Sequence, residues 1–258
     1  MNFNGMKSSN PAMKQMESQA LSLGPVDELI VDDSQRMTIN GTVNKTGILL
    51  AIVIAVSAFS WNTILNNPSL GYGLAITGAI GAFIASLVVS FKPKTAPIGA
   101  PIVAALEGLF VGAISAVFEA RYPGLVVQAL GLTVAVMFAM LFSYRTGLIK
   151  VTGTFKKVMT YAILGIAVFY VVSFIASFFG AAPSYFEMGN NSLFNIGLNL
   201  VIVGIAALSL VMDFDFIERA SEQNTPKFME WYGAFGLMIT LVWLYIELLR
   251  LMARFQED

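Results

Sequence analysis

Seven apolar runs, each long enough to cross a lipid bilayer, occupy most of this chain. A membrane-spanning helix needs about 20 mostly apolar residues. The runs lie at Thr46–Leu65, Leu70–Phe91, Pro97–Phe118, Gly124–Ser143, Val158–Phe179, Ser192–Met212 and Phe228–Leu251, with short connections between them. Because hydrocarbon offers no hydrogen-bond partners, the backbone that crosses it must form helix. The sequence therefore predicts an all-α, polytopic membrane protein with a bundle of seven transmembrane helices.

The composition excludes several classes of protein. Charged residues make up 12% of the 258 residues, about half the share that is typical of soluble domains. The net charge of −1 offers no basic surface for nucleic acid. Cysteine and histidine are both absent, which excludes disulfides, Ser-His-Asp hydrolysis and Cys or His metal ligands. We expect no enzyme and no cofactor, and the lipid bilayer as the first partner.

The polar segment before the first run has a different character. Residues 1–44 contain few apolar stretches, and Gly24–Pro25 interrupts them. No apolar stretch follows Met1, so we expect no cleavable signal peptide. We predict that residues 1–44 form a cytosolic tail, partly disordered, and that residues 45–258 form the transmembrane domain. The alternative is that the tail is a docking segment for a partner.

The basic residues predict the orientation in the membrane. Lysine and arginine concentrate in cytosolic connections. With seven spans, twelve of the fifteen basic residues fall on the side of the N-terminus, and three fall on the other side. The three are Arg121, Arg250 and Arg254. We therefore expect a cytosolic N-terminus and an external C-terminus in a cell membrane.

Ionisable residues inside a membrane are functional candidates, because charge is costly there. Glu107 lies near the middle of the third run, and we expect it to be neutral or paired with a cation from another helix. Glu247 lies near the outer end of the seventh run, where an interfacial ion pair with Arg250 is the simplest interpretation. Glu230 lies at the cytosolic start of that run.

The sixth run carries a polar stripe. At 100° per residue, Asn195, Asn199, Ser209 and Asp213 fall along one line of the helix, and we call this set the polar seam. Asp215 points to the opposite side and can pair with Arg219 at i+4. We predict that Asp213 faces the bundle interior, the alternative being an ordinary helix end in headgroup water, and that Asp215 is a solvated boundary charge. Both stay candidates, with Glu107, Glu230 and Glu247, for acids that gate an ion pathway. Depth in the membrane favours Glu230 over Glu247 as the neighbour of Asp213.

Three stretches resemble a bacterial branch of the Bax inhibitor family. They are MTINGTVNK with Thr46 at residues 37–46, DFDFIE at residues 213–218, and EWYGAFG at residues 230–236 followed by WLYIELLR at residues 243–250. The resemblance implies a compact bundle with the seventh helix at its centre. Together with the lack of cysteine, it also suggests that the cell membrane is a bacterial inner membrane.

The resemblance also implies a pH-sensing pair of acids, one on each of the last two helices, that gates a calcium leak. Asp213 matches the first acid. An alignment without gaps places Thr240 at the second acid, whereas a gap would place Glu230 or Glu247 there. A basic residue latches one acid in the family, and Arg145 and Lys92 are the candidates here. Calcium binding through Asp213 is part of this expectation.

Three functions remain open from the sequence. The first is a pH-sensitive cation leak controlled by carboxylates on the sixth and seventh helices. The second is a non-catalytic regulator that binds another membrane protein, such as a membrane protease or a quality-control complex. The third is an intramembrane aspartyl hydrolase, which needs two acids at one depth on facing helices. Measured calcium or proton flux separates the first two.

Overall fold

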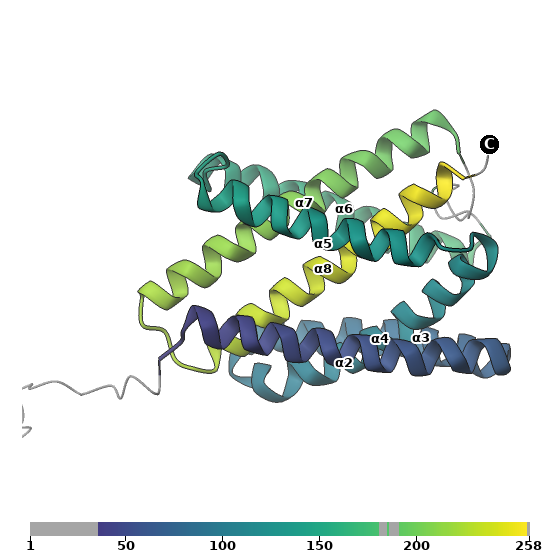
Figure 1. Ribbon diagram of the computed structural model, residues 1–258, viewed down its shortest axis with the longest axis horizontal. Helices are drawn as coiled ribbons and strands as arrows, with labels where there is room; N and C mark the ends of the chain where they lie inside the picture. The colour runs from purple at the N-terminus through teal and green to yellow at the C-terminus, as the bar shows by residue number, and fades with distance from the viewer. Residues whose placement is uncertain (1–35, 181–184, 186–190, 257–258) are drawn as a thin grey trace, which may run out of the picture. The chain divides into compact units, whose positions relative to one another are not determined.

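In the described part of the chain, seven long helices fall on the apolar runs of the sequence, and Figure 1 shows how they are arranged. A computed structural model describes residues 36–180, 185 and 191–256. The helices are α2 (Ile39–Asn66), α3 (Pro68–Phe91), α4 (Ala96–Arg121), α5 (Leu125–Arg145), α6 (Gly153–Phe178), α7 (Leu193–Glu222) and α8 (Met229–Arg254), and a short 3₁₀ turn, η2 (Pro93–Thr95), precedes α4. Every one of the seven is long and apolar enough to span a bilayer. The predicted all-α, seven-span architecture is confirmed.

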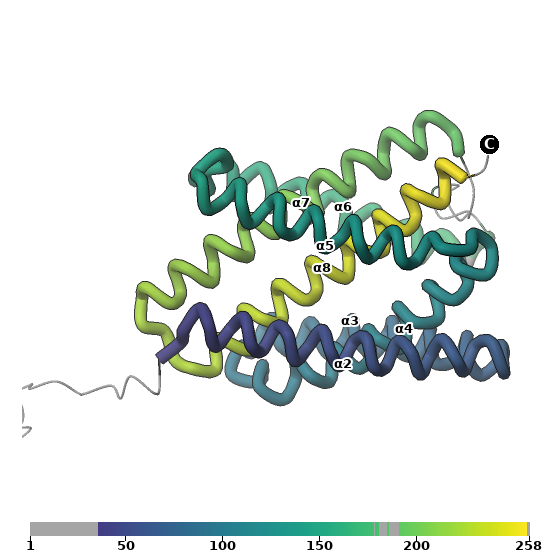
Figure 2. Tube along the Cα trace, in the orientation of Figure 1, coloured from purple at the N-terminus to yellow at the C-terminus, as the bar shows by residue number. Residues whose placement is uncertain are grey.

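Helix α8 is the central element of the unit that starts at Met37. It runs between the group of α2, α3 and α4 and the group of α5, α6 and α7 (Figure 2), and it packs against α2, α4, α5 and α7. In its most apolar stretch 67% of the residues are buried, against 11% in α6. The central place expected for the seventh helix is therefore confirmed.

Small residues allow close approach between α2 and α4. A Cβ atom added to Gly108 would lie 2.8 Å from the carbonyl oxygen of Val53, and one added to Gly112 would overlap the backbone of Ser57. The hydroxyls of Ser57 and Ser60 donate to carbonyl oxygens of α4, at 3.1 and 2.6 Å. In lipid such close packing and interhelical hydrogen bonds replace the hydrophobic effect as the source of helix association.

The two longest extensions beyond the predicted apolar runs are at the start of α2 and the end of α7. Helix α2 begins at Ile39 rather than near Thr46, because Thr38 caps it by accepting from the N–H of Gly41 at 2.9 Å. Helix α7 continues ten residues past Met212, to Glu222. Polar first and last turns satisfy themselves by capping and ion pairs, so hydropathy alone does not detect them. Most of the predicted tail, residues 1–35, lies outside the described residues, and residues 39–44 are helical.

Candidate functional site

The polar seam of α7 faces the bundle interior. Asn195, Asn199 and Ser209 are all buried, at 3%, 0% and 6% exposure. Ile202 and Ala206, which share the same stripe, are buried as well. The helical projection of the sequence therefore oriented α7 correctly, and its polar line lies against the central helix rather than lipid.

Asp213 ends the seam opposite a threonine, not opposite a second acid. Its carboxyl lies beside the Thr240 side chain of α8, and Gly236, one turn earlier, leaves room for it, because an added Cβ there would lie 3.7 Å from Oδ1. The Oδ2 atom of Asp213 is buried and has no hydrogen-bond partner. The expected proximity of Asp213 to Glu230 is wrong, since Glu230 lies ten residues, or about 15 Å, before Thr240 along α8.

Glu230 is held by the start of α2 instead. Its Oε1 accepts from both the backbone N–H and the hydroxyl of Thr38, at 2.9 Å each. Its Oε2 pairs with Lys45, whose ammonium also lies 5.5 Å from the ring centre of Trp231. A Cβ atom on Gly41 would collide with the carboxylate. The stretch at residues 37–45 thus surrounds one fully buried acid, a role that the sequence alone did not reveal.

Glu247 is the centre of a buried polar cluster. Its side chain is 1% exposed. Oε1 accepts from Tyr170 at 2.6 Å and from Arg250 at 2.8 Å, whereas Oε2 accepts from Tyr185 at 2.6 Å and from Asn199 at 2.9 Å. The expected pairing with Arg250 is confirmed, and the carboxylate is enclosed by protein rather than extended to a surface. Since α6, α7 and residue 185 all contribute donors, the site is enclosed from several sides.

Tyr185 connects this cluster to the segment between α6 and α7. Its ring lies 5.1 Å from the Arg250 guanidinium and 5.0 Å from that of Arg254. Arg254 also donates to the backbone carbonyl oxygen of Tyr185 at 2.5 Å. Burial, followed by the nearby Glu247 carboxylate, raises the pKa of the Tyr185 phenol. Tyr185 therefore stays a neutral hydrogen-bond donor to Glu247.

Asp215 differs from its expected role as a solvated charge. It is 5% exposed and pairs with Lys156 at 2.7 Å and with Arg219 at 2.8 Å. The i+4 pair with Arg219 is confirmed, and the solvated interpretation is wrong. The reason is that α6 begins at Gly153 and brings Lys156 beside the extended end of α7. The next acid, Glu218, accepts from the Tyr144 hydroxyl.

Among the ion pairs of the described residues, none joins an acid to a predicted latch residue. Arg145 lines a polar pocket of about 380 Å³ together with Asp215 and Glu218, while Lys92 follows the end of α3. In the described part of the chain, the carboxylates of α7 and α8 that form ion pairs do so with Lys45, Lys156, Arg219 and Arg250. Arg219 and Arg250 are the partners that helical spacing predicted, whereas Lys45 and Lys156 come from positions that the sequence did not suggest.

A family model described as Bax inhibitor 1 like matches residues 3–257. The chain belongs to this family. The comparison with curated proteins and the comparison with solved structures each found no match. As a member of the Bax inhibitor 1-like family with seven spanning helices, the chain is a multi-pass membrane protein.

Within this Bax inhibitor 1-like chain, the position that the gap-free alignment assigned to the second acid is the one that meets Asp213. That position is Thr240, which is 8% exposed. Glu230 and Glu247, the two alternatives that required a gap, are each bound elsewhere. The structure therefore places one carboxylate and one hydroxyl, rather than two carboxylates, at the α7–α8 contact.

Glu107 is the remaining acid inside the Bax inhibitor 1-like bundle. It lies midway along α4, and its Oε2 is buried without a hydrogen-bond partner. Among the ion pairs of the described residues, none includes Glu107. Of the two expectations from the sequence, the structure thus lacks the cation pair, and a neutral carboxylic acid stays a prediction. Among the described residues, no group of three or more Asp and Glu side chains forms a metal site.

Proposed function

We propose that this protein is a cation leak of the membrane, controlled by the single carboxylate of Asp213. The observation that carries the proposal is its buried, unpartnered Oδ2 at the contact between α7 and α8. A buried polar atom without a partner is costly, so its retention needs a reason. A binding step for a passing cation is such a reason, and calcium prefers oxygen ligands of this kind.

A second unpartnered oxygen supports the same path. The Oδ1 of Asn199 is buried without a hydrogen-bond partner, and Asn199 lies on the same stripe of α7 as Asp213. The two positions are 14 residues apart, which corresponds to about 21 Å along the helix. Ser209 adds a hydroxyl between them, and Thr240 adds one beside Asp213. The seam thus offers acceptor oxygens over most of a bilayer's hydrocarbon thickness of about 30 Å.

The charge state of Asp213 is the proposed control. A neutral Asp213 fits the closed α7–α8 contact, because a buried charge without a cation partner is unfavourable. Loss of its proton would place an uncompensated charge between the two helices and favour either a bound cation or separation of the helices. We therefore expect the flux to rise with pH as Asp213 ionises.

Flux into proteoliposomes tests this proposal. Asp213→Asn removes the titrating group while it keeps the side-chain shape, so we expect calcium flux to lose its pH dependence between pH 6 and 8. Glu222→Gln is the matched control, since it makes the same change at an exposed acid at the end of α7. Unchanged pH dependence in Asp213→Asn, or its loss in both variants, would contradict the single-carboxylate control.

The second candidate is a non-catalytic regulator that binds another membrane protein. The observation in its favour is the exposure of α6, which packs chiefly on α7 and buries only 11% of its most apolar stretch. Such a helix offers a long surface to a partner helix in the bilayer. Absence of flux in the unmodified protein, together with copurification of a membrane protein that is lost on substitution of α6, would favour this function.

The proposed location is a bacterial inner membrane, with the N-terminus in the cytosol. The twelve-to-three distribution of basic residues supports it. We expect a reporter fused after Asp258 to be active only outside the cytosol, and a reporter fused before Met1 to be active inside. A cytosolic C-terminal reporter would contradict seven complete spans.

A further inference from the structure

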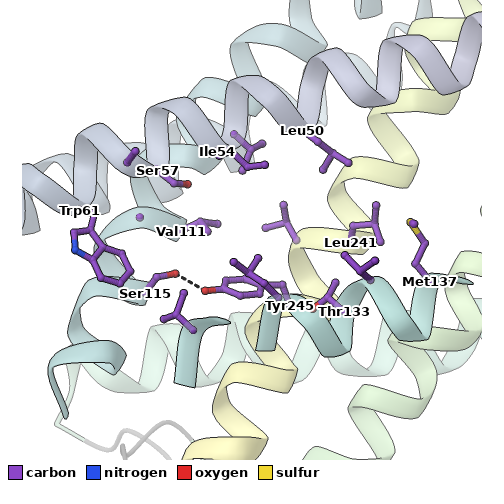
Figure 3. A pocket seen from close by; sticks show the side chains of 17 residues that line it. Leu50, Ile54, Ser57, Trp61, Val111, Ser115, Thr133, Met137, Leu241 and Tyr245 are labelled. Atoms are coloured by element: carbon purple, nitrogen blue, oxygen red, sulfur yellow. Dashed lines mark hydrogen bonds between the residues drawn. The ribbon is translucent and has the colours of Figure 1, made fainter. Parts of the chain in front are cut away.

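An apolar cavity of about 380 Å³ separates α2 from α5. The two helices pack on α4 and α8 rather than on each other. Figure 3 shows Leu50 and Ile54 of α2 on one side, Met137 on the other, and Tyr245 of α8 at the floor. The volume lies within the range of about 300 to 1,000 Å³ that is usual for small-molecule sites.

The hydroxyl groups in the lining are already hydrogen-bonded within the protein. Ser115 and Tyr245 bond each other at 2.6 Å, which joins α4 to α8 beneath the cavity (Figure 3). Ser57 donates to the carbonyl oxygen of Gly108 at 3.1 Å, and Thr133 donates to that of Ala129 at 2.7 Å. Because these groups have partners, the cavity selects an apolar occupant.

The cavity is long and narrow. On α2 its lining runs from Leu50 to Trp61, and on α5 from Val126 to Met137. The ends of each range are eleven positions apart, which corresponds to about 16 Å along the helix. A hydrocarbon core of about 30 Å is two lipid chains thick, so one chain spans about 15 Å. The length of the cavity therefore matches one extended chain from one leaflet.

The mouth of the cavity opens to the bilayer. Ile54 and Val134, on the two facing helices, are 66% and 49% exposed, and both lie inside membrane-spanning helices. The medium at that depth is hydrocarbon, not water. We propose that the cavity between α2 and α5 is a binding site for one acyl chain of a membrane lipid. The site is separate from the polar seam and does not rest on the proposed cation leak.

Photo-crosslinking in vesicles tests this site. The full chain is reconstituted in phosphatidylcholine that contains a trace of a phospholipid with a diazirine midway along one acyl chain, and adducts are mapped by mass spectrometry. Ile76 of α3, at 62% exposure, is the reference for ordinary lipid contact, because it matches Ile54 in type and exposure. We expect several-fold more adducts at Ile54 and Leu130 than at Ile76. Equal labelling would overturn the site.

A matched pair of variants sharpens the test. Ala58→Trp fills the cavity, which Ala58 lines, whereas Ala55→Trp places the same ring on α2 outside the lining. We expect only Ala58→Trp to abolish the excess labelling. Persistence of the excess in both variants would overturn the site.

Two further measurements use the unmodified protein. After extraction into detergent with little lipid, a bound chain keeps labelling Ile54, whereas ordinary lipid contact is lost; loss at both positions would overturn the site. A free fatty acid with the same diazirine identifies the source of the chain. Labelling by both probes shows that the chain alone suffices, and labelling by the phospholipid alone shows that the headgroup is also required.

Discussion

The acids near the two ends of α8 have more hydrogen-bond and ion-pair partners than the acid that lies against its middle. At one end Glu230 is fully enclosed by Thr38 and Lys45, and toward the other end Glu247 receives four donors. In the middle, the α7 acid Asp213 meets only Thr240 and keeps an unpartnered oxygen. The acids toward the ends of α8 therefore have partners on both oxygens, whereas the carboxyl opposite its middle keeps one oxygen without a partner.

Acids that the sequence alone does not distinguish therefore differ in how much they contribute to the stability of the bundle. A carboxylate with a complete set of donors stabilises one structure, because its loss leaves buried partners unsatisfied. A buried carboxyl oxygen without a donor is costly instead, and the proposed leak would give Asp213 a reason to carry one. Replacing each Glu in turn by Gln, which keeps the shape and removes the charge, measures the difference directly.

We expect the largest effect from Glu247→Gln. The amide nitrogen would face two of the four donors, and the Arg250 charge would lose its partner. Removal of one member of a buried ion pair costs about 3 to 5 kcal/mol, and we expect about 4 kcal/mol of the free energy of unfolding to be lost. Titration of mixed micelles with a denaturing detergent measures this loss. A change as small as that of exposed Glu222→Gln would show that the cluster is not formed.

Glu230→Gln is expected to cost somewhat less. The amide oxygen can still accept from Thr38, so the main loss is the partner of Lys45, whose side chain is 16% exposed and partly reached by water. We expect about 3 kcal/mol, at the lower end of the range for broken buried pairs. The same titration applies. Lys45→Met together with Glu230→Gln should recover part of the lost free energy of unfolding, since the charge of Lys45 is then also removed. If nothing is recovered, the hydrogen bonds from Thr38 contribute more to stability than the ion pair does.

The sequence predicted the features that depend on local periodicity. The seven spans, the inward face of the polar seam and the i+4 pair of Asp215 with Arg219 all follow from hydropathy or from helical spacing, and the structure contains them. Each of these depends on residues within one helix. Hydropathy and residue spacing along one helix are enough to predict such features from a single sequence.

The partners of the buried acids depend instead on contacts between distant segments. Lys45 and Glu230 are 185 residues apart, and Tyr185 reaches Glu247 from the connection between α6 and α7. Asp215 is buried because α6 starts earlier than its apolar run and supplies Lys156. Sequence spacing contains no signal for such contacts. The motif at residues 37–45 is recognisable in the sequence, but only the structure shows that its Thr38 and Lys45 bind Glu230.

Glu107→Gln provides the smallest expected effect and the sharpest contrast. Glu107 resembles Asp213 in having an unpartnered buried oxygen, and it lacks the donors that surround Glu230 and Glu247. If its carboxyl is neutral, Gln reproduces its charge and shape, so the free energy of unfolding should change by less than about 0.5 kcal/mol, the scatter expected for substitutions that break no specific feature. The detergent titration used for the other two acids gives this value under the same conditions. A loss as large as that of Glu230→Gln would mean that Glu107 is ionised and paired. Glu107 would then stabilise the bundle as Glu230 and Glu247 do. An unpartnered carboxyl oxygen would then no longer support the proposal that Asp213 controls the leak.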